Sequence, residues 1–305
     1  MNREEISRLL TLPLARLIAM ANETRQECAG SKIELCSIMN AKSGLCSQDC
    51  KFCAQSSRYS TGINTYSLKT RGQMLEAARR AKDIGAERFD IVTSGNRLNR
   101  DELSIIADAI QEITSKIGIK MCASLGSMEE RDLRLLKEAG LTRYHHNLET
   151  SENYFAKVVT THTFQDRIKT IKAAKKAGLE ICSGGIIGLG ETIDDRIQMA
   201  LVLKELDVDS VPVNILVPIE GTPFEDRATL SQSEAIKTIA LFRIILEAKT
   251  IKIAAGRESI LKDFQALAFM AGANGMLIGG YLTIKGREVD EDRKLIEEVK
   301  MLWQK

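Results

Sequence analysis

Three cysteines, Cys46, Cys50 and Cys53, lie within eight positions of one another in the spacing C-x3-C-x2-C. Three thiolates that converge in one loop can hold a metal ion or a metal cluster, but an odd number cannot pair off as disulfides. A structural zinc site usually takes four ligands as two separated pairs, and no second pair is present. An iron–sulfur cluster held by three thiolates leaves one iron open for a ligand that is not protein. The loop therefore favours an iron–sulfur cluster.

Composition limits the kind of protein that carries this loop. The 305 residues are 44% hydrophobic and 28% charged, with a formal net charge of +2, so nothing indicates a nucleic-acid or acidic-membrane partner. The first twenty residues alternate charged and apolar side chains, and no run of 18 apolar residues follows. We expect a cytoplasmic protein, and in that reducing compartment seven cysteines are metal ligands or core thiols rather than disulfides.

Strand-like and helix-like segments alternate along the chain. The strand-like segments cover 32–39, 88–94, 119–125, 143–149, 179–189, 210–217, 251–255 and 275–279. The helix-like segments cover 3–10, 12–27, 74–85, 101–117, 129–139, 164–177, 192–206, 231–248, 262–271 and 289–303. Alternation of this kind predicts right-handed crossovers and a parallel sheet.

Eight such units predict an α/β fold, a (β/α)8 TIM-type barrel preceded by two short N-terminal helices. No linker divides the chain, so we expect one domain, with N-terminal helices over 1–30, the barrel over 31–285 and a C-terminal helix over 286–305. In such barrels the chemistry lies at the C-terminal ends of the strands and in the loops that follow them. The cysteine loop follows the first strand and so lies on that face.

The motifs resemble one family over residues 30–285. They are "CSQDCKFCAQSSRYSTG", "HNLETS", "TTHTFQDR", "CSGGIIGLGET", "SVPVNIL", "GTP", "AGRES" and "FMAGAN". In order and spacing they resemble the biotin synthase family of radical S-adenosylmethionine enzymes. The resemblance implies that a 4Fe-4S cluster on the cysteine loop binds S-adenosylmethionine. Reductive cleavage of that cofactor would give a 5′-deoxyadenosyl radical, which takes hydrogen from unactivated C–H bonds.

The same resemblance assigns residues around the cofactor. Phe52 would lie beside the adenine, and Asn147 between cofactor and substrate. Glu149 matches an acidic partner of the ribose, and Arg167 matches another cofactor contact. Ile186 belongs to the glycine-rich run "GGIIGLGE", whose glycines allow the backbone to approach the cofactor closely.

The family also carries an auxiliary iron–sulfur cluster deep in the barrel, held by cysteines from three strands and one arginine. Cys122, Cys182 and Arg257 match three of these ligands, and Asp90 stands where the remaining cysteine is expected. A hard carboxylate is a poor replacement for thiolate on iron bridged by sulfide. We therefore expect an altered site in which Asp90 is not a ligand.

Two further thiols are candidates for this altered site. Cys36 lies in the first strand, next to the strand that carries Asp90, so an inward thiol there would reach the same cavity. Cys28 precedes that strand and would approach from the closed end of the barrel; a buried core thiol or a helix-terminal thiol is the alternative for each. With Cys28 as a fourth thiolate, the auxiliary cluster would hold four irons rather than two, and Arg257 would only offset its charge.

The adjacent histidines His145 and His146 do not predict a metal site. Neighbouring side chains on a strand point to opposite faces, so the two cannot easily share an ion. His145 stands where the family usually has an asparagine near the substrate. Asn214, in "VPVN", matches an asparagine that contacts the substrate.

The resemblance implies a sulfurtransferase that inserts sulfur into dethiobiotin to form biotin, with an electron donor such as flavodoxin or ferredoxin and a homodimeric state. One alternative is a related radical enzyme that isomerises or fragments another substrate, which Asp90 and His145 favour. Retention of Cys122, Cys182 and Arg257 argues against it, because such an enzyme has no need of interior thiols. A further alternative is a non-catalytic iron–sulfur or iron-sensing protein.

Overall fold

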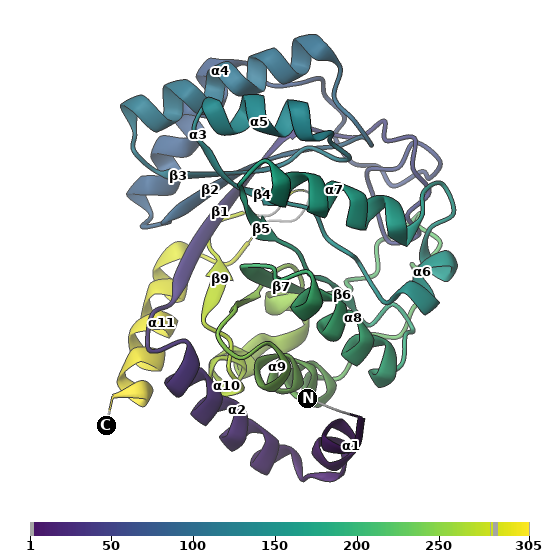
Figure 1. The fold of residues 1–305 in the computed structure, drawn as a ribbon, viewed down its shortest axis with the longest axis vertical. Coiled ribbons are helices and arrows are strands. Elements are labelled where there is room, and N and C mark those ends of the chain that lie inside the picture. The colour runs from purple at the N-terminus through teal and green to yellow at the C-terminus, as the bar shows by residue number, and fades with distance from the viewer. Residues whose placement is uncertain (1–2, 281, 283–285, 305) are drawn as a thin grey trace.

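The computed structural model describes residues 3–280, 282 and 286–304. The strands span Glu34–Lys42 (β1), Arg88–Thr93 (β2), Lys120–Ser124 (β3), Leu141–His145 (β4), Glu180–Cys182 (β5), Gly185–Ile187 (β6), Ser210–Ile215 (β7), Thr250–Ile253 (β8) and Gly275–Leu277 (β9). Within the described residues they form one sheet in the order β5-β4-β3-β2-β1-β9-β8-β7-β6. The sheet closes into a barrel with helices around it, which confirms the predicted (β/α)8 architecture (Figure 1).

The barrel closes at β7, which pairs with two strands. At its start, Ser210 lies opposite Cys182 of β5, and further along β7 pairs with all three residues of β6. Because β5 and β6 together fill one position, the sheet has the eight positions of the predicted barrel. The sequence predicts one strand over 179–189, and the structure divides it in two. At the break, a Cβ on Gly184 would lie 2.0 Å from the carbonyl oxygen of Pro212, so only glycine allows the two backbones to come this close.

The helices span Arg3–Thr11 (α1), Leu14–Cys28 (α2), Arg71–Asp83 (α3), Arg100–Lys116 (α4), Glu130–Glu138 (α5), Glu152–Val158 (α6), Phe164–Lys176 (α7), Ile193–Glu205 (α8), Gln232–Leu246 (α9), Gln265–Met270 (α10) and Val289–Trp303 (α11). Each predicted helix begins within three residues of its predicted start. The short helix α6 and a π-helical turn over Arg257–Leu261 (η1) were not predicted. No helix in the described part of the chain has both the length and the apolar character needed to cross a membrane.

Side-chain caps explain where several of these helices begin. Each of α3, α4, α7 and α8 starts at a capping box, in which two side chains satisfy backbone N–H groups left free by the first turn. At α4, Asn99 Oδ1 accepts from the N–H of Glu102 at 2.9 Å, and Glu102 Oε2 accepts from the N–H of Asn99 at 3.1 Å. Such caps join residues three apart, so they require no contact with distant parts of the chain.

The two ends of the chain meet on the outside of the barrel. Helix α2 packs against α9 and α10, and α10 packs against α11. The guanidinium of Arg25, which is 2% exposed, lies 3.7 Å from the centroid of the Trp303 ring. This cation–π contact ties α2 to α11. The expected boundary between barrel and C-terminal helix at residue 285, and the last residue, 305, lie outside the described residues.

Candidate active site

One cavity of about 430 Å³ joins the cysteine loop to the interior of the barrel. Six of the seven cysteines line it: Cys36, Cys46, Cys50, Cys53, Cys122 and Cys182. Three belong to the loop after β1, and the other three come from β1, β3 and β5. Two groups of three thiols, one at the mouth and one deeper, therefore face a single space.

Backbone contacts and one sharp turn hold the cysteine loop in shape. Gly44 and Leu45, with φ of 74° and 54°, turn the chain sharply after β1. The backbone N–H of Cys46 then donates to the carbonyl oxygen of Gln55 at 3.0 Å, which closes the loop on itself. At the other side of the loop, the carboxylate of Asp49 accepts backbone N–H bonds from residues 160 and 161 at 2.9 and 3.1 Å. The loop is thus fixed at both of its sides.

Burial changes the acidity of two of the loop thiols. Burial raises the pKa of Cys53 to about 11 and holds the pKa of Cys50 well above its usual range, so both must lose a proton when they bind iron. Over the residues that the structure describes, no three His, Cys, Asp or Glu side chains converge on a point suited to one metal ion. An iron–sulfur cluster spreads its thiolates over several irons with sulfide between them. The three loop thiols line one cavity, as ligands of such a group would.

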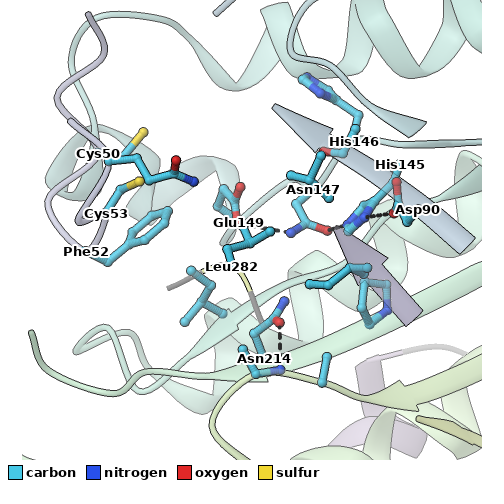
Figure 2. A pocket seen from close by; sticks show the side chains of 18 of the residues that line it. Cys50, Phe52, Cys53, Asp90, His145, His146, Asn147, Glu149, Asn214 and Leu282 are labelled. Atoms are coloured by element: carbon cyan, nitrogen blue, oxygen red, sulfur yellow. Dashed lines mark hydrogen bonds and ion pairs between the residues drawn. The ribbon is translucent and has the colours of Figure 1, made fainter. Parts of the chain in front are cut away.

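The residues predicted to bind the cofactor all line the same cavity: Phe52, Asn147, Glu149, Arg167 and Ile186. Figure 2 shows Cys50, Phe52 and Cys53 on one side and Asn147 and Glu149 on the other. Glu149 has a φ of 69°, a left-handed conformation that is strained for a residue with a side chain. Its carbonyl oxygen accepts from the N–H of Ile186 at 2.8 Å, which helps to fix this backbone.

Arg167 connects the cofactor side of the cavity to the loop after α6. Its Nη1 donates to the carbonyl oxygen of Asn147 at 2.9 Å and lies 3.4 Å from Glu149 Oε1. Its Nε donates to His162 Nε2 at 3.1 Å. Burial and the charge of Arg167 lower the pKa of His162 to about 4, so the imidazole is neutral and able to accept. The guanidinium is therefore held from both sides.

Asn214 also lines the cavity, although its amide makes two backbone contacts. Its Nδ2 donates to the carbonyl oxygen of Gly185 at 3.2 Å, and its Oδ1 accepts from the N–H of Ala255 at 3.1 Å. These bonds tie the ends of β6, β7 and β8 together. The side chain is positioned at the cavity, and within the described part of the chain one amide hydrogen and one lone pair have no partner and can meet a ligand.

The three interior thiols lie beside a buried lysine that sequence reasoning missed. Lys252, on β8, is 3% exposed and places Nζ 3.0 Å from Cys36 Sγ. Burial raises the pKa of Cys36 to about 11, against the opposing charge of Lys252, and holds the pKa of Cys122 well above its usual range. The motif "IKIAA" contained a signal, because a single lysine between buried apolar residues of a strand must either leave the core or find partners within it.

A network of charges lies beneath these thiols. Glu34 Oε1 is 2.9 Å from Lys252 Nζ and 2.7 Å from Arg143 Nη1, and Glu34 Oε2 is 2.9 Å from Arg88 Nε. Glu180 joins both arginines, at 2.7 Å from Arg88 and 2.9 Å from Arg143. Burial alone would raise the pKa of Glu34, but Lys252 and Arg143 outweigh it and hold the pKa well below its usual range. Three cations against two carboxylates leave positive charge beside the thiols.

The structure does not bring two of the predicted residues to the cavity. Arg257 lies in η1, beyond the end of β8, and its buried guanidinium pairs with Asp292 Oδ2 on α11 at 2.6 Å. The interior cation from this segment is therefore Lys252, which lines the cavity from within β8, whereas Arg257 does not line it. Cys28 ends α2 on the outside of the barrel and is exposed. No fourth thiol from Cys28 reaches the interior group.

Asp90 and His145 lie between the interior thiols and the cofactor residues. Their side chains meet on the cavity wall, with His145 Nδ1 3.1 Å from Asp90 Oδ2 (Figure 2). Burial would lower the pKa of His145, but Cys182 and Asp90 outweigh it and raise the pKa to about 9. His146 points away from this pair, as the alternation of side chains along the chain predicts.

Comparison with known families and proteins agrees with this geometry. The chain matches the Radical SAM superfamily over residues 42–203 and the Biotin and Thiamin Synthesis associated domain over residues 212–301. It is 59% identical to the biotin synthase of Thermotoga neapolitana over 89% of this chain and 98% of the relative. It is 54% identical to that of Thermotoga petrophila over 98% of this chain and 99% of the relative.

Solved structures give the fold independently. Methylornithine synthase superposes with a TM-score of 0.84 at 22% identity and covers 100% of this chain and 93% of its own. The FeFe-hydrogenase maturase HydG of Carboxydothermus hydrogenoformans superposes with a TM-score of 0.79 at 20% identity, over 92% of this chain and 70% of its own. At these identities the likeness concerns the barrel alone. The two family matches and the relatives that align over nearly the whole chain show that the chain belongs to the biotin synthase family of radical S-adenosylmethionine enzymes.

Proposed function

We propose that this enzyme converts dethiobiotin to biotin by inserting a sulfur atom taken from an auxiliary iron–sulfur cluster. The observation that carries the proposal is the single cavity that exposes two separate groups of three thiols to one space. A radical enzyme without sulfur transfer needs only the first group. The interior group has no structural use of its own, because buried free thiols near three cations could be replaced by apolar residues at lower cost.

The two groups of thiols divide the work. Cys46, Cys50 and Cys53 hold the 4Fe-4S cluster at the cavity mouth. With S-adenosylmethionine and one electron from a reductant, a cluster held there would supply the radical chemistry that removes hydrogen from carbon, and an auxiliary cluster held by the interior thiols would supply the sulfur. The protein positions the reactants and keeps water away from them.

The side chains at the cavity mouth orient S-adenosylmethionine. Phe52 offers an apolar face to the adenine, Glu149 accepts hydrogen bonds from the ribose, and Ile186 packs against the cofactor. Arg167 holds the carboxylate of Glu149 and the backbone of Asn147 in place. The amides of Asn147 and Asn214 face the same space and bind the polar cyclic urea of dethiobiotin.

The interior site takes Cys36, Cys122 and Cys182 as its ligands. Lys252 and Arg143 lie beside these thiols and offset the negative charge of thiolates and sulfide. Asp90 is not a ligand in this proposal, since a carboxylate suits iron bridged by sulfide poorly and Asp90 is already paired with His145. Arg257 takes no part, because its guanidinium is used by Asp292.

The proposal further includes a single domain over 1–305 whose barrel covers 31–285, a cytoplasmic homodimer, and a one-electron reductant such as flavodoxin or ferredoxin. The dimer and the reductant rest on likeness to the family, and the single domain and the location rest on the sequence alone. Gel filtration with light scattering tests the dimer, and reduction of the first cluster by purified flavodoxin tests the electron donor.

An anaerobic single-turnover assay tests the function. The reconstituted enzyme, with isotopically labelled sulfide in its clusters, should form labelled biotin together with 5′-deoxyadenosine when dethiobiotin, S-adenosylmethionine and reductant are added. The matched variant Cys36→Ser should release 5′-deoxyadenosine yet form no biotin, and its iron content should fall to that of one cluster. Iron and sulfide per chain in the wild-type protein give the number of irons in the second cluster.

Two results would count against this function. If dethiobiotin does not stimulate cleavage of S-adenosylmethionine, isomerisation or fragmentation of another substrate replaces sulfur insertion. If Cys36→Ser keeps both clusters and still makes biotin while Asp90→Ala loses the second cluster, the ligand set is wrong.

A further inference from the structure

Asp90, His145 and Asn147 form a continuous row of hydrogen-bonded side chains along the cavity wall (Figure 2). His145 Nδ1 lies 3.1 Å from Asp90 Oδ2, and His145 Nε2 lies 2.9 Å from Asn147 Oδ1. At the far end, Asn147 Nδ2 points to Glu149 Oε2 at 3.4 Å. The row therefore runs from the depth of the barrel to the residue proposed to bind the cofactor.

The neighbouring backbone fixes the direction of these hydrogen bonds. The N–H of Gly184 donates to Asn147 Oδ1 at 3.2 Å, so the oxygen of this amide must be the atom that faces His145. The imidazole then meets an acceptor at each nitrogen, the amide oxygen on one side and the Asp90 carboxylate on the other. It can satisfy both only by donating from both nitrogens, as an imidazolium whose charge Asp90 balances. In consequence the amide nitrogen of Asn147 is turned toward Glu149 and the cavity.

The position of the row relates it to both groups of thiols. Asp90 lies opposite Cys122 in the pairing of β2 with β3, and His145 lies opposite Cys182 in the pairing of β4 with β5. Asn147 follows two residues later on the path to the cofactor side. The Asn147 amide thus lies between the interior thiols and the residues proposed to bind the cofactor.

A purely structural role explains the row poorly. Asp90 is 6% exposed, and its Oδ1 is shielded from solvent without a hydrogen-bond partner among the described residues. A buried carboxylate with one oxygen unsatisfied destabilises the fold, and an apolar pair of similar size would avoid that cost. Groups of this kind are retained where their orientation of another group matters.

We propose that Asp90 and His145 are positioning residues for the substrate: they lock the Asn147 amide so that its N–H donors face the carbonyl oxygen of a cyclic urea. This inference rests on the proposed function, because that function supplies the substrate class. The charged pair acts through Asn147 and does not touch iron. The pair thereby fixes the position of the substrate between the cofactor and the interior sulfur. Removal of hydrogen from the substrate then leads to sulfur transfer, and not to cleavage of S-adenosylmethionine without product.

The test compares substrate binding in matched variants of the reconstituted, S-adenosylmethionine-loaded protein. The variants are Asp90→Asn, which removes the charge, and His145→Phe, which removes both donors at similar ring size. His146→Phe is the control, since it makes the same change at an adjacent residue that also borders the cavity but whose ring points away from the row. Calorimetry gives the dissociation constant for dethiobiotin and, separately, for S-adenosylmethionine.

We expect both row variants to bind dethiobiotin roughly tenfold to a hundredfold more weakly, the effect of losing a charge-assisted hydrogen bond, with unchanged S-adenosylmethionine affinity and iron content. They should also release more 5′-deoxyadenosine per biotin formed. His145→Gln, which keeps one N–H donor for Asn147 Oδ1, should recover part of the affinity and serves if the phenylalanine variant fails to fold. The control should bind dethiobiotin as the wild type does.

Wild-type dethiobiotin affinity in Asp90→Asn and His145→Phe, with both clusters loaded, would overturn the inference and leave the proposed function standing. Loss of interior iron in Asp90→Asn would also overturn it, because Asp90 would then be a ligand. Failure of the wild-type protein to bind dethiobiotin would overturn the proposed function, and the inference with it.

Discussion

Replacement of Lys252 by methionine tests whether the buried cation stabilises the interior thiolates. The side chain is 4% exposed, with Nζ 3.0 Å from Cys36 Sγ and 2.9 Å from Glu34 Oε1. Methionine is unbranched and flexible and fills a similar volume, so the change removes charge with little loss of packing. Any large effect is then electrostatic in origin.

The two partners of Lys252 should respond differently. Glu34 keeps Arg143 at 2.7 Å and Arg88 at 2.9 Å, so the carboxylate stays paired, and we expect a loss of folding stability below the ~3–5 kcal/mol typical of a stranded buried charge. For a thiolate at Cys36, an ammonium at 3.0 Å with an effective dielectric constant of ~20 gives an attraction of about 5.5 kcal/mol. Even a third of that energy is worth roughly twentyfold in a binding constant. We therefore expect the substitution to weaken binding of the interior cluster more than it lowers folding stability.

The assay measures iron and sulfide per chain before and after a chelator challenge, together with the melting temperature and the yield of 5′-deoxyadenosine. Lys252→Met should lose the iron of one cluster to the chelator much faster than the wild type, while cofactor cleavage continues. Lys249→Met is the matched control, because this lysine, three residues earlier, pairs with Asp207 on the surface. If Lys252→Met keeps its iron as well as the control does and inserts sulfur at the wild-type rate, the electrostatic reasoning is refuted.

Further substitutions test other parts of the site. Cys50→Ala should abolish 5′-deoxyadenosine release, because two thiolates do not hold the first cluster; undiminished release would remove the loop from the mechanism. Gly185→Ala would place a Cβ 2.5 Å from the carbonyl oxygen of Glu149, so we expect about tenfold weaker binding of S-adenosylmethionine by calorimetry, and wild-type affinity would show that the strained Glu149 backbone is unimportant. Asp292→Ala removes the closest carboxylate from the buried guanidinium of Arg257. It should lower the free energy of unfolding in denaturant by about 3 kcal/mol without loss of iron. Loss of iron with an intact fold would indicate that Arg257 does take part in cluster binding. In the cluster-free chain, the Cys36 pKa of about 11 leaves the thiol protonated at neutral pH, so its alkylation, followed by mass spectrometry, should rise ~tenfold per pH unit up to about 11; a plateau near pH 9 would contradict the raised pKa.

The sequence by itself determined the local features. Cys46, Cys50 and Cys53 lie within one loop, so their spacing predicts a cluster-binding loop without knowledge of the fold. Helix starts followed the same rule, because caps such as Asn99 with Glu102 join residues three apart. The alternation of strands and helices then left the barrel as the closed form of a parallel sheet with eight positions.

Only the tertiary structure decided which side chains meet across the barrel. Asp90 lies beside Cys122, and His145 beside Cys182, because the register of neighbouring strands places them opposite each other. A shift of one residue along a strand turns a side chain from the interior to the helix layer, so motif position alone could not choose between Lys252 and Arg257. Contacts of this kind join residues far apart in the sequence, such as Lys252 and Cys36, and their geometry exists only when the barrel has closed.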